Sequence, residues 1–187
     1  MPKLSLIMIV KDEADCLADC LSSVAPIADE LVVADTGSTD ATAGVARRFG
    51  ARVFPIPWEN DFAKARNLGM AEAAGDWLLH MDADEVVDEA NASKLRAVVD
   101  EDGRGADAIE VTLANYCNEI NSWRWVPVDP AAPASRGFCG YLAVPLLRLF
   151  RNGRGFEYRE PVHENISESV LEKEGTIRAE PILIHHY

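Results

Sequence analysis

Residues 77–85 read Trp-Leu-Leu-His-Met-Asp-Ala-Asp-Glu, an apolar run that ends abruptly in acidic residues. The apolar part, Trp77 to Met81, predicts a short buried strand. Residues i and i+2 of an extended chain point to the same side, so the carboxylates of Asp82 and Asp84 share one direction. Carboxylate oxygens are the ligands that hard divalent cations prefer. The competing interpretation is a solvated acidic turn over residues 82–89, and the position of this turn in the fold decides between the two.

Three similar runs precede this one, each bounded by a segment with helical spacing. The runs are Leu4 to Val10, Glu30 to Ala34 and Arg52 to Ile56, and the helical segments are Cys16 to Val24, a segment capped by Thr39 or Asp40 that ends at Phe49, and Asp61 to Ala74. The unbroken apolar run Leu4 to Val10 is typical of a strand covered on both faces of a parallel sheet. Strands that alternate with helices predict an α/β domain with a mostly parallel sheet flanked by helices.

The acidic residues gather at one edge of this expected sheet. Ligands of parallel α/β sheets bind at the carboxyl ends of the strands. Asp12, Asp35, Asp82 and Asp84 all follow such an end. This shared edge favours a functional site over a solvated turn.

The second half of the chain has a weaker pattern. We expect a helix from about Asn91 to Val99 and strands at Ala108 to Leu113, Val144 to Phe150 and Ile177 to Ile184. Between the first two of these strands, Tyr116 to Gly140 is rich in proline and lacks periodicity, which predicts a long loop or flap. The chain is expected to be one domain over residues 1–187, with a first half to residue 90 and a smaller mixed region over 91–187. The abrupt stop at His185-His186-Tyr187 leaves two alternatives open: a complete domain, or a piece of a longer protein.

The composition excludes some partners. The chain has 31 acidic against 18 basic side chains and a net charge of −13, which repels nucleic acid and anionic membrane surfaces. A phosphate-bearing substrate is compatible with this charge when a divalent cation stands between carboxylate and phosphate. The N-terminal apolar run is too short for a signal peptide or a membrane span. The default expectation is a cytoplasmic protein, free or held peripherally at the inner membrane. The four scattered cysteines match no zinc spacing and are interpreted as buried thiols.

Two local motifs point to other enzymes. Asp35-Thr36-Gly37-Ser38 is the string of aspartic proteases, but a helical segment follows it here, whereas those proteases are almost wholly β. Asp82-Ala83-Asp84-Glu85-Val86 fits the nucleophile motif of haloacid-dehalogenase-like phosphatases, with Asp82 as nucleophile. Those enzymes carry the motif on their first strand and need a later lysine and acidic pair, so this alternative is weaker.

Four motifs taken in order resemble the family 2 glycosyltransferases. They are Leu4 to Glu13, Leu31 to Asp40, Asp61-Phe62-Ala63-Lys64-Ala65-Arg66-Asn67, and Asp82-Ala83-Asp84-Glu85. The similarity is strong over residues 4–90 and looser beyond. The pairs His163-Glu164 and His185-His186 resemble sequence features of the bacterial branch that contains lipopolysaccharide-core and peptide S-glycosyltransferases. The resemblance implies a GT-A-like fold and transfer of a sugar, with inversion, from a nucleotide diphosphate sugar, UDP being the expected nucleotide, to an acceptor hydroxyl.

The resemblance also implies roles for single residues. The loop from Val10 through Asp12 to Glu13, together with Asp35, would hold the base and ribose, with Asp35 accepting a hydrogen bond from a uracil-like imide. Arg66 would face the donor, although it could merely pair with Asp61. Asp82 would reach the ribose or a metal-bound water. Asp84 would ligate Mn²⁺ or Mg²⁺ directly. The family often has asparagine before the glutamate, where this chain has Asp12, so the acid that contacts the base is left open.

The chemistry of the transfer suggests the remaining candidates. Glu164 is the candidate base for the acceptor hydroxyl, against the alternative of a surface glutamate. A neutral imidazole can ligate manganese, so one of the last two histidines is a candidate for the third metal ligand. Side chains alternate along a strand, so only one of the two points inward, and His185 is preferred. Trp123, Trp125 and Tyr141 are candidates for an acceptor wall that stacks on sugar rings, and a glycan, a lipid-linked sugar or a peptide are the acceptors considered. His80 is expected in the core. A non-catalytic nucleotide-sugar binding module is the alternative from a different functional class.

Overall fold

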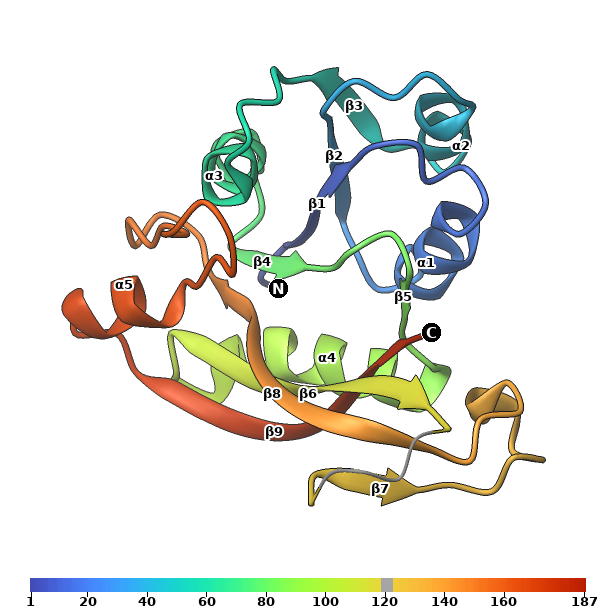
Figure 1. Cartoon of the computed structure of the whole chain (residues 1–187). Coiled ribbons are helices and arrows are strands. Elements are labelled where there is room, and N and C mark those ends of the chain that lie inside the picture. Colours follow the sequence, from blue (N-terminus) through green and yellow to red (C-terminus); the bar gives the residue numbers. More distant parts are fainter. Residues whose placement is uncertain (119–122) are drawn as a thin grey trace.

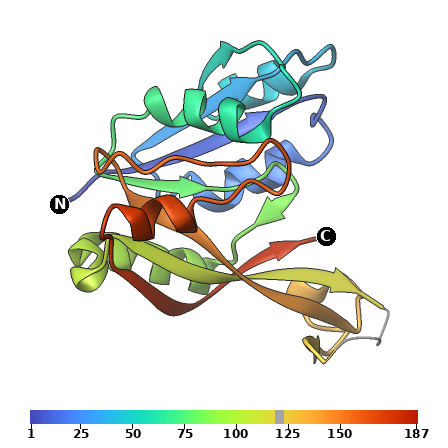
Figure 2. The ribbon, with the colours of Figure 1, turned by 60° about the vertical axis from the view of Figure 1, so that its left-hand side comes forward.

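One sheet runs through the whole computed structural model, which describes residues 1–118 and 123–187. Figure 1 shows two halves: β1 to β4 with helices α1 to α3 above, and the longer strands β6, β8 and β9 with α4 below. The turned view of Figure 2 shows the same two layers, with the two halves meeting along β4. The strand order is β3-β2-β1-β4-β8-β6-β9-β5, and β7 pairs with β8 outside this order.

The first half is the expected parallel α/β unit. β1 (Leu4–Val10), β2 (Glu30–Asp35), β3 (Arg52–Pro55) and β4 (Trp77–His80) are parallel neighbours, and α1 (Leu17–Val24), α2 (Thr42–Arg48) and α3 (Phe62–Ala71) connect them. Alternate residues of β1 serve opposite faces: Leu6 packs in the core under α1 and α2, whereas Ile7 packs with Ala63 of α3. Burial on both faces explains why β1 is apolar throughout.

The second half is the expected mixed region of the sheet. β8 (Gly140–Arg151) lies antiparallel to β4, β6 (Ala108–Cys117) lies antiparallel to β8, and β9 (Ile177–His186) lies parallel to β6. The remaining elements are β5 (Glu85–Val86), β7 (Trp125–Pro127), α4 (Glu89–Asp100), α5 (Ser167–Glu172) and the 3₁₀ turns Asp102–Gly105 and Pro133–Ser135. The fold is therefore α/β with a curled mixed sheet.

The curl of the sheet determines where the acidic turn lies. The chain leaves β4, passes through residues 81–84 and enters β5, which pairs not with β4 but with the end of β9. The acidic turn therefore bridges the parallel half and the last strand of the other half. In the β5–β9 pair, Glu85 lies opposite His186. Residues about a hundred positions apart in the sequence meet here as a result.

The predicted flap between residues 116 and 140 is partly regular. Tyr116 pairs with Tyr141 and Cys117 with Gly140, so β6 and β8 extend into it, and β7 adds a short strand. Prolines hid this pairing in the sequence, because Pro127 ends the short strand and Pro130 and Pro133 follow it. Residues 119–122 of this stretch lie outside the described residues. In the described part of the chain, no helix has the length and apolar character needed to cross a membrane.

Two glycines with different surroundings test this packing. A Cβ on Gly75 would stand 2.6 Å from the Ser5 hydroxyl oxygen and 2.8 Å from the Ser5 backbone nitrogen, whereas nothing lies within 4 Å of a Cβ on Gly44 in α2. We predict that Gly75→Ala lowers the free energy of unfolding by about 1–3 kcal/mol through overpacking. Gly44→Ala should raise it by about 0.5–1 kcal/mol through helix propensity. Urea denaturation of both variants checks this, and equal effects of the two substitutions would contradict the β1–β4 packing.

Candidate active site

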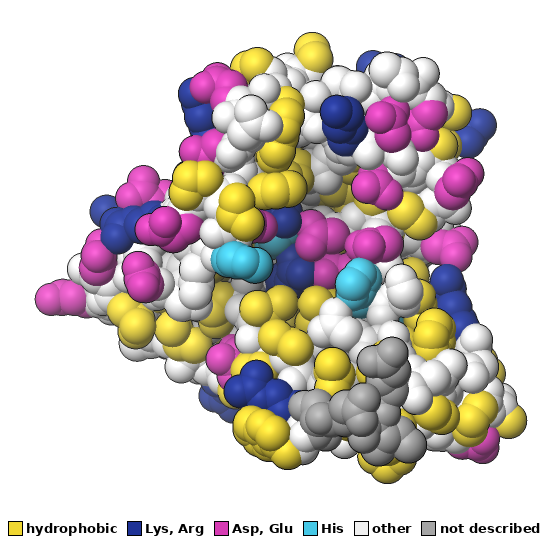
Figure 3. Space-filling view, in the orientation of Figure 1, with side chains coloured by type: hydrophobic (Ala, Val, Ile, Leu, Met, Phe, Trp, Pro, Cys, Tyr) yellow, Lys and Arg dark blue, Asp and Glu magenta, His cyan; other side chains and the backbone are white. Residues whose placement is uncertain are grey.

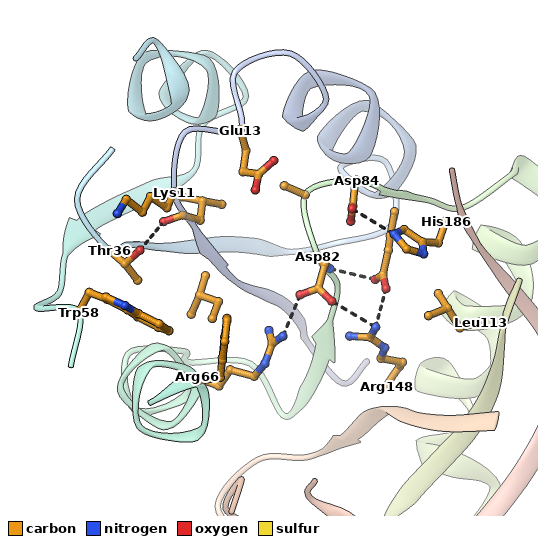
Figure 4. A pocket seen from close by; sticks show the side chains of 15 residues that line it. Lys11, Glu13, Thr36, Trp58, Arg66, Asp82, Asp84, Leu113, Arg148 and His186 are labelled. Carbon is orange, nitrogen blue, oxygen red and sulfur yellow. Dashed lines mark hydrogen bonds and ion pairs between the residues drawn. The ribbon is translucent and has the colours of Figure 1, made fainter. Parts of the chain in front are cut away.

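A pocket of about 480 Å³ opens at the carboxyl ends of β1, β2 and β4, where the sequence predicted a site. Figure 3 shows it as a hollow between the two halves, in which acidic and basic side chains gather with imidazole rings beside them. Figure 4 shows the side chains that line it. They are Ile9, Val10, Lys11, Glu13, Thr36, Trp58, Phe62, Arg66, Asp82, Ala83, Asp84, Glu85, Leu113, Arg148 and His186.

Two arginines from different halves hold Asp82. Its Oδ1 lies 3.0 Å from Nη2 of Arg66 on α3, and its Oδ2 lies 3.3 Å from Nη2 of Arg148 on β8. Arg148 also contacts Glu85 at 2.5 Å, and Glu85 accepts a hydrogen bond of 2.9 Å from the backbone N–H of Asp82. Both guanidinium groups are buried. We call Arg66, Asp82, Arg148 and Glu85 the ionic cluster.

The cluster shifts the pKa of its two carboxyl groups in opposite directions. Burial works against ionisation of Asp82, but the hydrogen bond from His80 and the charges of Arg66 and Arg148 hold its pKa well below the ordinary value. Glu85 is almost fully buried, and this desolvation, with the neighbouring Asp82 and Asp84 charges, raises its pKa to about 7 despite the attraction of Arg148. Asp82 is therefore ionised, and its negative charge balances the charges of Arg66 and Arg148.

His80 lies beneath the cluster, in the core as predicted. It is 5% exposed, and its Nδ1 accepts a hydrogen bond of 2.7 Å from the Tyr158 hydroxyl while Nε2 lies 3.3 Å from Asp82 Oδ1. Burial and the charges of Arg66 and Arg148 lower the pKa of His80 to about 3. The ring is therefore neutral, with Nε2–H donated to Asp82 and Nδ1 left to accept.

Asp84 is the carboxylate that the arginines leave accessible. Its side chain is 47% exposed, and Oδ2 lies 3.1 Å from Nε2 of His186 (Figure 4). The hydrogen bond to Asp84 raises the pKa of His186. The sequence had favoured His185, but the structure places it on the other face of β9, 3% exposed and not lining the pocket, with Nε2 3.1 Å from Asp88 and Nδ1 3.0 Å from the Tyr116 hydroxyl. The register of β9 against β5 decides which imidazole faces the pocket.

Asp84 and His186 fit the donor set of a divalent cation. Adjacent ligands of an octahedral ion, with bonds of about 2.1 Å, stand about 3 Å apart, close to the separation of these two atoms. Within the described residues, no group of three or more histidine, cysteine or acidic side chains is arranged to hold a metal. The two side chains would therefore hold an ion whose remaining ligands are water and substrate oxygens.

The loop after β1 is only partly on the pocket wall. Val10 and Glu13 line the pocket, with Lys11 and Thr36, which the sequence analysis had not singled out. Asp12 has a left-handed backbone (φ 54°), and its Oδ1 accepts a hydrogen bond of 2.7 Å from the N–H of Thr39. Asp12 thus ties the loops after β1 and β2 together.

Asp35 likewise makes local contacts, within the turn that follows β2. Its Oδ1 accepts hydrogen bonds of 2.9 and 2.7 Å from the backbone N–H groups of Gly37 and Ser38. Neither Asp12 nor Asp35 borders the pocket. Their direct contact with a nucleoside stays a prediction.

A second cavity of about 360 Å³ adjoins the pocket and shares Arg66, Asp82 and Arg148 with it. Glu164 and His163 lie on its wall. The Oε1 of Glu164 is 2.6 Å from Nε of Arg66, so the arginine pairs with Asp82 and Glu164 rather than with Asp61, which caps α3 by accepting from the Lys64 N–H. The ionic cluster forms the partition between the two cavities.

The predicted tryptophan wall does not border either cavity. Trp123 is 88% exposed, and Trp125 lies in β7, where its ring covers Gly140. β7 pairs with the beginning of β8, at the end of that strand remote from β4 (Figure 1). Tyr141 packs against Tyr116 at a ring separation of 5.5 Å. The aromatic side chains that do line the pocket are Trp58 and Phe62, in edge contact at 4.8 Å.

Comparison with solved structures identifies the fold. Staphylococcus aureus TarS, residues 1–349, matches 98% of this chain and 60% of its own with a TM-score of 0.66 at 16% identity. Glucosyl-3-phosphoglycerate synthase from Mycobacterium tuberculosis matches 60% of this chain and 44% of its own with a TM-score of 0.52 at 23% identity. The curled mixed sheet is that of a GT-A domain.

The chain belongs to glycosyl transferase family 2, whose family model matches residues 5–163. A TPR repeat-containing protein of Synechococcus elongatus is 36% identical over 91% of this chain and 37% of its own length. The lipopolysaccharide core biosynthesis glycosyltransferase LpsC of Rhizobium meliloti is 30% identical over 89% of this chain and 58% of its own length. The chain thus spans less than two thirds of these curated relatives. Membership of this family decides against the phosphatase alternative.

The buried neutral His80 makes stability depend on pH. An unfolded chain binds a proton at His80 below its ordinary pKa of 6.5, whereas the folded chain does so only near pH 3. This contribution to the free energy of unfolding is therefore present above pH 6.5 and falls as the pH is lowered toward 3. His80→Asn should reduce the pH dependence in this window by up to one proton, about 1.4 kcal/mol per pH unit.

Urea denaturation between pH 4 and 7 measures this slope. His163→Asn, at an exposed histidine, is the control and should keep the native slope. The same slope in His80→Asn as in the native protein would show that His80 is not held neutral.

Proposed function

We propose that this chain is the catalytic domain of an inverting glycosyltransferase that takes UDP-sugars with Mn²⁺ or Mg²⁺. The observation that carries the proposal is the pairing of Asp84 with His186 at the mouth of the pocket, beside an Asp82 already neutralised by arginines. The family membership supports sugar transfer. A chain of net charge −13 needs a cation to accept a diphosphate at this acidic edge.

The nucleotide and the metal are inferred from the pocket and its relatives. TarS was crystallised with UDP-GlcNAc, and the mycobacterial synthase with Mn²⁺ and UDP. In this chain, Lys11 and Thr36 offer polar groups and Trp58 offers an aromatic face to a nucleoside. Asp84 and His186 would hold the cation. When bound, a divalent cation supplies positive charge that stabilises the departing diphosphate.

We propose that the acceptor binds in the second cavity, because this cavity borders the ionic cluster on the side opposite the first pocket. Its wall carries Glu164, and we propose this carboxylate as the base. In the transfer, Glu164 takes the proton of the acceptor hydroxyl as that oxygen bonds to the anomeric carbon. The bond from this carbon to the diphosphate oxygen breaks, and UDP leaves with the electron pair. Attack from the face opposite the leaving group gives inversion.

Asp84→Ala tests the donor site. We expect Mn²⁺ to raise the affinity of the native protein for UDP at least about tenfold and to have no effect in Asp84→Ala, because the substitution removes one of the two ligands proposed among the described residues. Isothermal titration of UDP with and without Mn²⁺ measures this. Asp15→Ala, at an exposed aspartate outside the pocket, is the matched control. An unchanged effect of Mn²⁺ in Asp84→Ala would overturn the assignment.

Glu164→Gln tests the catalytic role with water as acceptor. Loss of a general base should reduce the hydrolysis of a UDP-sugar by about 10²–10⁴-fold while UDP binding persists. Release of UDP from UDP-GlcNAc and UDP-glucose is the readout, with Glu168→Gln as the control at an exposed glutamate outside both cavities. Full hydrolysis in Glu164→Gln would exclude this base. Metal-dependent binding without any turnover by the native chain would favour the non-catalytic binding module.

A further inference from the structure

Asn115 contacts the pocket histidine from outside the pocket. It lies on β6, opposite His186 of β9 on one side and Leu142 of β8 on the other. Its Oδ1 is 2.6 Å from Nδ1 of His186, and its Nδ2 is 3.5 Å from the carbonyl oxygen of Leu142. Leu113, two residues earlier on the same strand, lines the pocket. Asn115 therefore stands on the pocket face of β6, one step behind the wall.

The amide group of Asn115 determines which imidazole nitrogen carries the proton. The amide nitrogen can only donate, and it faces the Leu142 carbonyl, which can only accept. The amide oxygen consequently faces His186 and can only accept a hydrogen bond. Nδ1 of His186 must then carry a proton. Nε2 lies 3.1 Å from Asp84 Oδ2 and donates its proton to that carboxylate when the ring is charged; once that proton is lost, Nε2 presents a lone pair at the same place, where a cation can take it.

This arrangement suits a cation. An Nε2 lone pair and a carboxylate oxygen are both electron-pair donors, so they converge favourably on a shared positive ion. The opposite tautomer would donate Nε2–H to Asp84 and leave no lone pair at that position. A hydrogen bond that fixes the tautomer of a metal-binding histidine changes metal affinity without touching the metal.

We propose that Asn115 is a positioning residue that fixes His186 as the Nδ1–H tautomer and so prepares Nε2, together with Asp84, for a divalent cation. This inference rests on the proposed function. It extends that function to a residue outside the pocket. The other face of β9 offers a comparison, because the Tyr116 hydroxyl, which can donate as well as accept, contacts Nδ1 of His185 away from the pocket.

The test compares three variants with the native protein at pH 8. Asn115→Ala removes the acceptor, and Asn115→Asp retains an acceptor oxygen. Tyr116→Phe removes the hydroxyl that contacts Nδ1 of His185 and leaves the contact of His185 with Asp88. The first readout is the tautomer of His186 in metal-free protein, from long-range ¹H–¹⁵N correlation spectra. We expect Nδ1–H in the native protein, in Asn115→Asp and in Tyr116→Phe, and Nε2–H in Asn115→Ala.

The second readout is Mn²⁺ affinity in the presence of UDP, from the electron paramagnetic resonance of free Mn²⁺. Asn115→Ala should bind Mn²⁺ about 10–100-fold more weakly, whereas Tyr116→Phe should match the native protein and Asn115→Asp should recover most of the affinity. A purely structural role would lower stability without changing the tautomer.

The outcomes separate this inference from the function on which it rests. If the native protein shows no Mn²⁺-dependent binding of UDP, the proposed function fails. If it binds both but Asn115→Ala keeps the native tautomer and affinity, only the role of Asn115 fails. An Nε2–H tautomer in the native protein also overturns the inference, and that measurement needs no variant to fold.

Discussion

The site depends on two arginines that hold one carboxylate between the halves of the sheet. Arg66 comes from α3 in the parallel half and Arg148 from β8 in the other, and both contact Asp82. Buried guanidinium groups are strongly destabilising without partners, so each half supplies a charge that the other needs. Holding Asp82 in this way assigns different roles to two carboxylates two residues apart. Asp82 fixes the turn, and Asp84 stays accessible.

The topology explains why these groups meet. Because β8 lies antiparallel beside β4, it delivers Arg148 beneath the acidic turn, and because β5 pairs with the end of β9, it brings His186 to Asp84. The same two pairings create a cavity on each side of the ionic cluster. In the proposed transfer, the donor on one side and the acceptor on the other would meet where both cavities border Arg66, Asp82 and Arg148.

Sequence reasoning reached the parallel half and the edge that carries the site, because apolar runs and helical spacing are local signals. It found Asp82 and Asp84 for the same reason. It preferred His185 to His186, but which of the two faces the pocket depends on the register of β9 against β5, which no local pattern shows. It also missed Arg148, whose partners lie 63 and 66 residues away, although an arginine within an apolar strand is a signal that a buried anion is near. Trp123 and Trp125 were assigned by residue type alone, whereas Trp125 lies in β7, Trp123 is exposed just before it, and neither lines the two cavities.

The central claim is that Asp84 and His186 hold the cation while Asp82 stays with its arginines. A crystal structure of the protein with UDP and Mn²⁺, with the metal located by its anomalous scattering, tests this most directly. The account predicts manganese bound to a carboxylate oxygen of Asp84 and to Nε2 of His186, with Asp82 still in contact with Arg66 and Arg148. Manganese bound by Asp82, with the arginines displaced from it, would contradict the account.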